Sequence, residues 1–439
     1  MKSPALSLFA ATAALLALGS AAHATKLDLS SEVEIKAANY EHLIYGSGQA
    51  SQSLFSENAA LGFIIKGIRL EKTQDSSMDV GIVLQSVGPG ASSNTITSPQ
   101  FADAIGRLPD ADGTPFVRGA YVKVYKFLHP NITATFGRQD FTLAQGITLA
   151  SDDLGLPGGR LEFANVYRSL KADLFFFRPF SLNRYNKIYG ATVYYPGSEG
   201  LWQAYHFWEQ DGGTGTAYQD VLFTDVLSKT KKFTGLRYVL TQKQLSFDGE
   251  TVIQRGTAER AGGGTGKYEA HAFMLKGAWS QNVSFFGQSR LRLGYGRSSG
   301  NPGAGSTDKA FFPAFGSKFN GLERKGYGSI AGATLYDIIK TSDTANGLPN
   351  GVSGLNIINI GADLPYKKLI ISADLYKFRA SKNANAGSLQ IASEYDIKAT
   401  YAFGDNLHLN AVYAVFTPLS LYPQSKQVKL TYGAISARF

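Results

Sequence analysis

The sequence predicts an all-β fold, a transmembrane antiparallel β-barrel, on three observations. First, apolar and polar residues alternate in short runs such as Leu27–Ala37 and Glu394–Tyr401. Because successive side chains of a strand point to opposite faces, each run makes a strand with one apolar and one polar face. Second, 48 Gly, 28 Phe and 23 Tyr suit many tight turns and the aromatic girdles of a membrane barrel. Third, the chain after its first two dozen residues has no run of about twenty apolar residues, so no spanning helix is expected.

Residues 1–24 are predicted to be a secretory signal peptide, and residues 25–439 a single barrel domain. Lys2 supplies the positive start, Ala5–Leu18 the apolar stretch, and residues 22–24 a small-x-small cleavage site. The stretch is too short and too rich in alanine to favour an uncleaved membrane anchor. The chain has no cysteine, which excludes disulfides, thiolate metal sites and a lipid-modified cysteine at the cut.

The exported chain is expected in the cell outer membrane rather than as a soluble protein. Its mean hydropathy of -0.11 is compatible with a barrel, because alternation hides the lipid-facing residues in the average. A soluble β-helix or propeller would show a recurring repeat, and none is visible. No proline- or serine-rich linker divides the chain into further domains.

Candidate strands recur along the whole chain. They begin near Lys26, Ala60, Met78, Phe116, Asn131, Leu161, Lys171, Asn186, Leu201, Lys232, Lys267, Gln288, Gly354, Lys368, Ser393, Leu407 and Gln427. These are about seventeen, and bacterial barrels have even numbers of strands. About sixteen or eighteen strands are therefore expected, with eighteen preferred and one strand missed.

The connections between strands alternate in length toward the C-terminus. Gly404–Asn406 and Pro365–Tyr366 are tight turns, whereas residues 380–392 and 418–426 form longer polar segments. In barrels of this class, short turns face the periplasm and long loops face outside. Counting back from a terminal strand that ends in the periplasm, Ser298–Ser353 should form one external excursion.

The last strand carries a candidate signal for the barrel-assembly machinery, which would recognise the terminal aromatic residue Phe439. Phe439 and Ile435 share one face, whereas Leu430 and Val428 have the opposite parity. A bulge at Gly433 would bring both sets to one face, since one extra residue reverses the alternation.

The formal net charge of +9 predicts a basic lumen rather than a nucleic-acid partner, because the cations are scattered singly without a basic run. Arg290 and Arg292 alternate with leucines, and Arg237 is placed similarly. An arginine that faced the bilayer midplane would cost about 2–4 kcal/mol, so these side chains are assigned to the lumen. Two roles stay open for each of them. It passes carboxylates along the channel, or it pairs with lumenal acids such as Glu32, Glu34, Glu269 and Asp396 and holds the wall together.

The excursion Ser298–Ser353 is a candidate gate if it folds into the lumen. Its basic candidates are Lys309, Lys318, Arg324 and Lys325. Its aromatic residues Phe311, Phe312, Phe315 and Phe319 either stack on sugar rings or pack the loop against the barrel, and packing is the safer expectation. Asp152 and Asp153, in an earlier loop, are expected to form a solvated turn rather than a cation site.

Several segments resemble the alginate-export porin family. They are Phe136–Gln139, Gly159–Leu161, Phe311–Pro313 with Gly326–Gly328, and Glu394–Ile397 with Tyr413–Pro418. Gly158 stands where that family usually carries an acid, and the histidine expected in the long loop is absent. The resemblance implies a monomeric barrel that passes a polyuronate through a basic lumen, and it adds Arg138 and Arg160 to the lumenal candidates.

Enzymatic chemistry is not indicated. Gly296–Gly300 fits the G-x-S-x-G pattern, but residues 301–303 are Asn-Pro-Gly where a helix would have to begin. No motif for a nucleotide, a metal or another cofactor is present, so no cofactor is expected.

We therefore expect a diffusion channel for an anionic oligo- or polysaccharide of the alginate type, surrounded by outer-membrane lipid and working as a monomer. The alternative within transport is a general porin for small anions or neutral sugars. From other classes, an outer-membrane barrel hydrolase would need a Ser-His-acid geometry, and a structural barrel or adhesin would have a plugged lumen.

Overall fold

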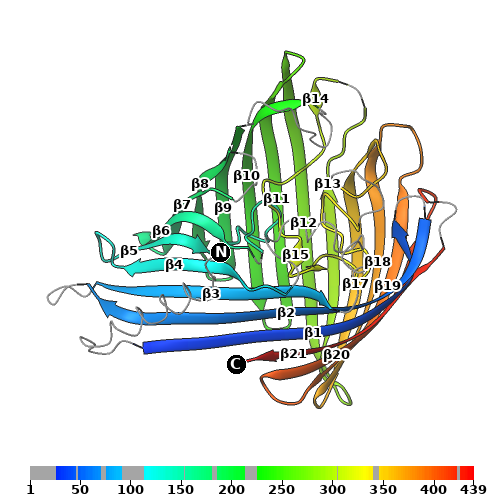
Figure 1. The fold of residues 1–439 in the computed structure, drawn as a ribbon, viewed down its shortest axis with the longest axis horizontal. Coiled ribbons are helices and arrows are strands. Elements are labelled where there is room, and N and C mark those ends of the chain that lie inside the picture. Colours follow the sequence, from blue (N-terminus) through cyan, green and yellow to red (C-terminus); the bar gives the residue numbers. More distant parts are fainter. Residues whose placement is uncertain are drawn as a thin grey trace, which may run out of the picture.

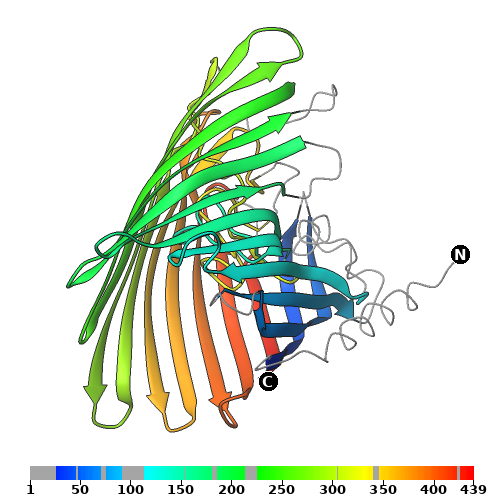
Figure 2. The ribbon, with the colours of Figure 1, turned by 90° about the vertical axis from the view of Figure 1, so that its left-hand side faces the viewer.

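The computed structural model is a closed barrel of tilted strands (Figures 1 and 2). It describes residues 26–45, 48–70, 76–90, 113–152, 154–179, 185–212, 225–303, 305–339, 346–422 and 426–439. Within these ranges, no helix is long and apolar enough to cross a bilayer. The proposed signal peptide and its cleavage site lie outside the described residues, and so does Asp153.

The wall consists of β1 to β13 and β17 to β21, each antiparallel to its neighbours, and the pairing of β21 with β1 closes the ring. The wall strands are β1 (Lys26–Tyr45), β2 (Gly48–Arg69), β3 (Ser77–Gly90), β4 (Phe116–Tyr125), β5 (Ile132–Gln139), β6 (Leu156–Tyr167), β7 (Leu170–Phe177), β8 (Tyr185–Pro196), β9 (Gly200–Gly212), β10 (Val226–Gln242), β11 (Leu245–Arg260), β12 (Thr265–Val283), β13 (Gly287–Ser298), β17 (Val352–Tyr366), β18 (Leu369–Asn383), β19 (Gln390–Ala402), β20 (Leu407–Pro418) and β21 (Val428–Arg438). The preferred expectation of an eighteen-stranded antiparallel barrel is confirmed.

The strand that the sequence pattern missed is β11. It carries Gly249 and Gly256 in its interior, and polar residues such as Glu250 and Thr251 lie on both of its faces. Only Ile253 is a large apolar side chain exposed near its centre. A strand with polar residues on both faces shows no period of two in hydrophobicity, so the alternation that marks the other strands is lost here.

The long excursion after β13 is confirmed, because β13 ends at Ser298 and the next wall strand, β17, begins at Val352. It contains three two-residue strands, β14 (Thr307–Asp308), β15 (Phe319–Asn320) and β16 (Glu323–Arg324). β14 pairs in parallel with β12, and β15 pairs with β16. The short turns lie at the end of the barrel where β21 finishes, so that end faces the periplasm.

The outer surface of the wall is apolar in its middle and aromatic near its periplasmic edge. Leu293 of β13, with 55% of its surface exposed, and Leu375 of β18 point outward. Near the periplasmic turns, the rings of Phe285 and Tyr366 stack with centroids 5.1 Å apart. An apolar band bordered by aromatic residues is the surface that lipid tails and the membrane interface cover, and it places this barrel in the outer membrane.

The terminal strand has no bulge at Gly433, and that expectation is wrong. The pairing of β21 with β1 and with β20 runs without a register shift. Ile435 faces outward, whereas Val428 and Leu430 are buried on the lumenal side. Apolar residues occur at inward positions because the outer part of the lumen is filled by protein. Recognition of Phe439 by the assembly machinery stays a prediction.

A charge at the middle of the outer band should destabilise the inserted barrel. Leu293→Lys should lower the free energy of unfolding in liposomes by about 2–4 kcal/mol, because the ammonium group would face the bilayer midplane. The same change at Val283, which lies beside a periplasmic turn, should cost about 0–1 kcal/mol. Urea titrations followed by tryptophan fluorescence measure both values, and equal costs would contradict the assigned membrane position.

Candidate functional site

Two loops from the outer end of the barrel lie within the ring of strands. The inner loop comprises residues 299–351, between β13 and β17, and the short inner loop comprises residues 140–155, between β5 and β6. Figure 1 shows β15, which belongs to the inner loop, inside the outline of the wall. From Phe311 onward, the inner loop as far as it is described folds into the lumen, as the gate hypothesis required.

The two loops hold each other through their backbones. The amide of Ala150 donates a hydrogen bond to the carbonyl of Phe315 at 2.6 Å, and the amide of Ser317 donates to the carbonyl of Gly146 at 2.8 Å. These hydrogen bonds satisfy backbone groups that have little access to water. The loops therefore form one inner body rather than two independent flaps.

Asp152 is the main side chain of this junction, and the expectation that it forms a solvated turn is wrong. Its carboxylate accepts hydrogen bonds from the amides of Lys318 and Phe319 at 2.8 and 3.0 Å. The ammonium group of Lys325 lies 2.8 Å from the same carboxylate. Only 8% of Asp152 is exposed, so it joins the loops to each other and is not presented to solvent.

Inward-facing carboxylates of the wall accept hydrogen bonds from the inner loop. Glu394 of β19 accepts from the amides of Ile330 and Ala331 at 2.7 and 3.0 Å. Asp396 of the same strand accepts from the amide and the hydroxyl of Ser329 at 2.9 and 2.8 Å. Because a buried amide without an acceptor costs free energy, these carboxylates fix where the turn at residues 329–331 rests on the wall.

Further wall residues hold the two loops on other sides of the barrel. Glu250 of β11 accepts a hydrogen bond from the amide of Gln145 at 2.8 Å and from the Tyr205 hydroxyl at 2.6 Å. Lys36 of β1 lies 2.8 Å from the carboxylate of Glu323 in β16. The inner body is thus attached to β1, β11 and β19, which lie at well separated positions around the ring.

A buried aspartate organises the interior of the inner loop. Asp337 pairs with Lys318 and Arg324, and Thr334 donates a hydrogen bond to it at 2.5 Å. Burial alone would raise the pKa of Asp337, but the charges of Arg324 and Lys318 and the hydrogen bonds outweigh burial. The pKa of Asp337 therefore lies below its ordinary value, and the carboxylate stays ionised at neutral pH.

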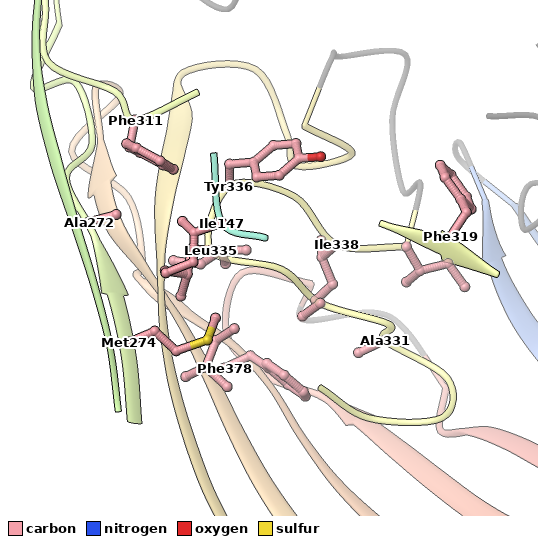
Figure 3. Packing of buried hydrophobic residues seen from close by; sticks show 14 of the residues in the cluster. Ile147, Ala272, Met274, Phe311, Phe319, Ala331, Leu335, Tyr336, Ile338 and Phe378 are labelled. Atoms are coloured by element: carbon pink, nitrogen blue, oxygen red, sulfur yellow. The ribbon is translucent and has the colours of Figure 1, made fainter. Parts of the chain in front are cut away.

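Apolar side chains complete the attachment of the inner loop to the wall (Figure 3). Leu335 and Ile338 of the loop lie near Met274 of β12 and Phe378 of β18 within one buried cluster. Phe319 belongs to the same cluster and is almost fully buried, as is Phe311. The expectation that aromatic residues of the loop pack against the barrel is confirmed for Phe311 and Phe319.

A cavity of about 620 Å³ remains between the inner body and the wall strands β10 to β13, β17 and β18. Lys276 of β12 and Arg290 of β13 line it from the wall, and Lys325 lines it from the inner loop. Within the described ranges, neither Arg290 nor Lys276 forms an ion pair, and both side chains are exposed to the cavity. Asp248 also lines the cavity, but it is paired with Arg237, so Lys276 and Arg290 have no carboxylate of the described wall within ion-pair distance.

Three tyrosines border the same cavity, Tyr327 and Tyr336 from the inner loop and Tyr376 from β18. Burial raises the pKa of Tyr327 to about 12, so this phenol stays neutral and can donate a hydrogen bond. In the part of the chain that the structure describes, the Tyr327 hydroxyl has no hydrogen-bond partner. The hydroxyl itself is buried, so a solute would reach it only if the ring turned toward the cavity.

Three of the arginines assigned to the lumen face inward and are bound to wall carboxylates. Arg160 lies 2.7 Å from Asp173 and 3.1 Å from Glu162. Arg237 donates two hydrogen bonds to Asp248, from Nε to Oδ1 at 2.8 Å and from Nη2 to Oδ2 at 2.7 Å. Arg292 bridges Asp363 and Asp374, and its Nη2 atom lies 2.9 Å from a carboxylate oxygen of each. These contacts match the wall-holding role, and Arg290 differs from them in being unpaired.

Two candidates are not where the sequence predicted them. Arg138 has the parity of Phe136, which faces outward, and it donates hydrogen bonds to the carbonyls of Val117 and Leu154 at 3.3 Å. It therefore binds backbone carbonyls at the outer end of the wall and does not face the lumen.

Lys309 precedes the point where the loop turns inward and lies in a hollow on the outer face of the barrel. Lys309 is not among the residues that line the lumenal cavity, and a role in a gate stays a prediction for it.

The other gate candidates lie in the inner body, and each has an acidic partner there. Lys318 and Arg324 neutralise Asp337, and Lys325 pairs with Asp152. They hold the loop in place, and Lys325 also borders the cavity.

Sequence reasoning missed Lys276. The outer half of its strand β12 is apolar on both faces, because Ala270, Ala272 and Met274 point inward against the inner loop. The alternation that would mark Lys276 as a lumenal residue is therefore weak. The outward face could have revealed Lys276, because the aromatic side chains of Phe273 and Trp279 are exposed there. Counting from either of these aromatic residues places Lys276 on the opposite, lumenal face.

Comparison with solved structures finds barrels of the same fold. A BenF-like porin from Pseudomonas fluorescens Pf-5 gives a TM-score of 0.57 at 11% identity, covering 94% of this chain and 98% of that one. OccK9 (OpdG) from Pseudomonas aeruginosa gives 0.57 at 15% identity, with the same coverage. OpdK from Pseudomonas aeruginosa, solved with vanillate, gives 0.53 at 11% identity, again with that coverage.

Neither models of known families nor curated proteins give a match to the sequence. The structural neighbours show the same barrel fold as this chain. They do not support alginate export in particular.

The inner loop should loosen in acid. Because the pKa of Asp337 is depressed in the folded protein, its contribution to stability is present above the ordinary value of 3.8 and is lost as pH falls below it. Single-channel recordings should be quiet at neutral pH and become noisier as the pH is lowered below 3.8. Asp337→Asn should be noisy already at neutral pH, whereas Asp405→Asn in a periplasmic turn should behave like the wild type. A quiet Asp337→Asn channel would contradict the anchoring role.

Proposed function

We propose that the protein is a passive channel for small organic anions, and that the cavity below the inner body is its selective passage. The observation that carries this proposal is that Arg290 and Lys276 lie at the cavity without an ion pair to any residue that the structure describes, while Arg160, Arg237 and Arg292 are neutralised. A paired arginine has little charge to offer a solute, whereas an unpaired one attracts and briefly holds an anion.

The size of the passage favours small solutes over polysaccharide chains. The inner body fills much of the lumen and is attached on several sides by hydrogen bonds and by a buried apolar cluster. An acidic polymer would need this body to leave the lumen, at the cost of its buried contacts. A small anion needs only the cavity that is already present.

The chemistry of the cavity fits a carboxylate attached to a small ring. The guanidinium group of Arg290 can donate two parallel hydrogen bonds to a carboxylate. The aromatic side chains of Tyr327, Tyr336 and Tyr376 border the same space and can pack against the ring of the solute. The neighbour OpdK was solved with vanillate, an aromatic carboxylate, and this supports the proposed class of solute.

Passage would proceed by exchange of the anion between neighbouring cations. Arg290 and Lys276 come from adjacent strands, β13 and β12, and Lys325 faces them from the inner loop. In a hydrated cavity, each contact is weak enough to be released, and the concentration gradient supplies the driving force. No catalytic group takes part, and we expect no enzymatic activity.

Anion selectivity should depend on the two unpaired cations. In planar bilayers under a salt gradient, the wild-type channel should give a reversal potential that indicates preference for anions. The variant Arg290→Ala with Lys276→Ala should lose most of that preference, because little uncompensated positive charge then remains at the cavity. Arg138→Ala, which removes an outward-facing cation, should leave the potential unchanged. Unaltered selectivity of the double variant would contradict the proposal.

The class of solute can be tested by block of the current. Vanillate should block the open channel, and the corresponding neutral alcohol should not, because the carboxylate supplies the contact with Arg290. Arg290→Ala should raise the blocking concentration by at least about tenfold, since a hydrogen bond to a charged group contributes about 1.5–3 kcal/mol. Block by polyuronate at much lower concentration than vanillate would favour the polysaccharide channel instead.

A further inference from the structure

A second hollow lies on the outer face of the barrel, away from the lumen. It has a volume of about 570 Å³ and is formed by β11 to β13, the start of the inner loop and the end of β18. Ile253 and His271, which are paired across β11 and β12, belong to its lining and point outward. A hollow on this face meets lipid or the outer solvent, and the channel solute does not pass through it.

The hollow lies at the outer edge of the apolar band. Successive outward residues of β13 are Leu291, Leu293, Tyr295 and Arg297, so the strand changes from apolar to aromatic to basic as it rises. Arg297 is ten residues above Gly287 at the periplasmic end, which corresponds to about 25 Å along the membrane normal for a strand tilted by about 40°. Its guanidinium group therefore lies at the level of the outer headgroups.

Positive charge dominates the lining of the hollow. Four cations contribute to it, Arg255, Arg297, Lys309 and Lys382, against one acid, Glu269. Arg255 lies 3.3 Å from Glu269, and both side chains are about half exposed. In the portions of the chain that are described, Arg297, Lys309 and Lys382 form no ion pair. Three cations at one headgroup-level hollow are therefore left without a protein counter-charge.

We propose that this hollow binds the phosphate groups of an anionic lipid in the outer leaflet. The charge of the cations is complementary to that of phosphate, and several clustered donors suit a headgroup with more than one phosphate. Directly below the hollow, the rings of Phe273 and Tyr295 lie 6.1 Å apart, and the apolar band continues toward Leu293. Acyl chains of the same lipid would cover this band, which a soluble phosphate would not use.

The proposal can be tested on the full-length barrel purified in an uncharged detergent. Native mass spectrometry would count bound molecules of a diphosphorylated glucosamine-disaccharide glycolipid and of the same glycolipid without phosphates. The phosphorylated lipid should bind at least tenfold more tightly. Arg297→Ala with Lys309→Ala should weaken its binding about tenfold, because each basic side chain near an anionic surface contributes a severalfold factor.

The matched control is Lys429→Ala, which removes an exposed cation that pairs with Glu41 at the outer end of β21. It should leave lipid binding unchanged, and all variants should keep the wild-type conductance, which shows that they fold. Equal binding of both glycolipids, or an unaffected double variant, would overturn the proposal. Displacement of the lipid by inorganic phosphate at the same molar ratio would also overturn it, because the hollow would then be a site for soluble anions.

Discussion

The structure depends on the need to satisfy backbone amides that the inner loop carries into the lumen. Where this loop packs against the wall, its N–H groups have little access to water, and each needs an acceptor. Glu394 and Asp396 supply acceptors for residues 329–331, and Glu250 supplies one for Gln145. The carboxylates of the wall therefore serve first as acceptors for the inner loops, and the position of the inner body follows from them.

This constraint also determines which cations are left for a solute. Lys318 and Arg324 are required at Asp337, and Arg292 is required between Asp363 and Asp374. A channel with positive net charge can thus present few free cations in its lumen. Among the described residues, Arg290 and Lys276 are two lumenal cations without an ion pair, and they lie where the inner body leaves a cavity. Net charge alone does not indicate selectivity, because pairing removes most of the lumenal charges from contact with ions.

Local alternation was sufficient to predict the barrel and the inward face of Arg237, Arg290 and Arg292, and the even number of strands in bacterial barrels corrected its count of about seventeen to eighteen. It failed at β11, where both faces are polar, and at Arg138, where a short motif was followed instead of the outward parity of Phe136. The inner loop was beyond local patterns, because its anchors join residues far apart in the sequence, such as Glu394 and Ile330. Which cation is neutralised is decided by such distant contacts, so sequence alone could not separate Arg290 from the other arginines.

The position of the inner loop against the wall can be measured most directly by a disulfide. A Cβ atom at Gly321, in the turn between β15 and β16, would lie 3.1 Å from Cγ of Asn58 on β2, and the chain has no cysteine of its own. Because Cγ of asparagine occupies the place of a sulfur atom, Gly321→Cys with Asn58→Cys should form a disulfide in the folded barrel. Formation of this disulfide without added catalyst, together with a quiet channel, is the result expected here. Two free thiols that both react with a bulky maleimide added from outside would show that the loop does not rest on the wall.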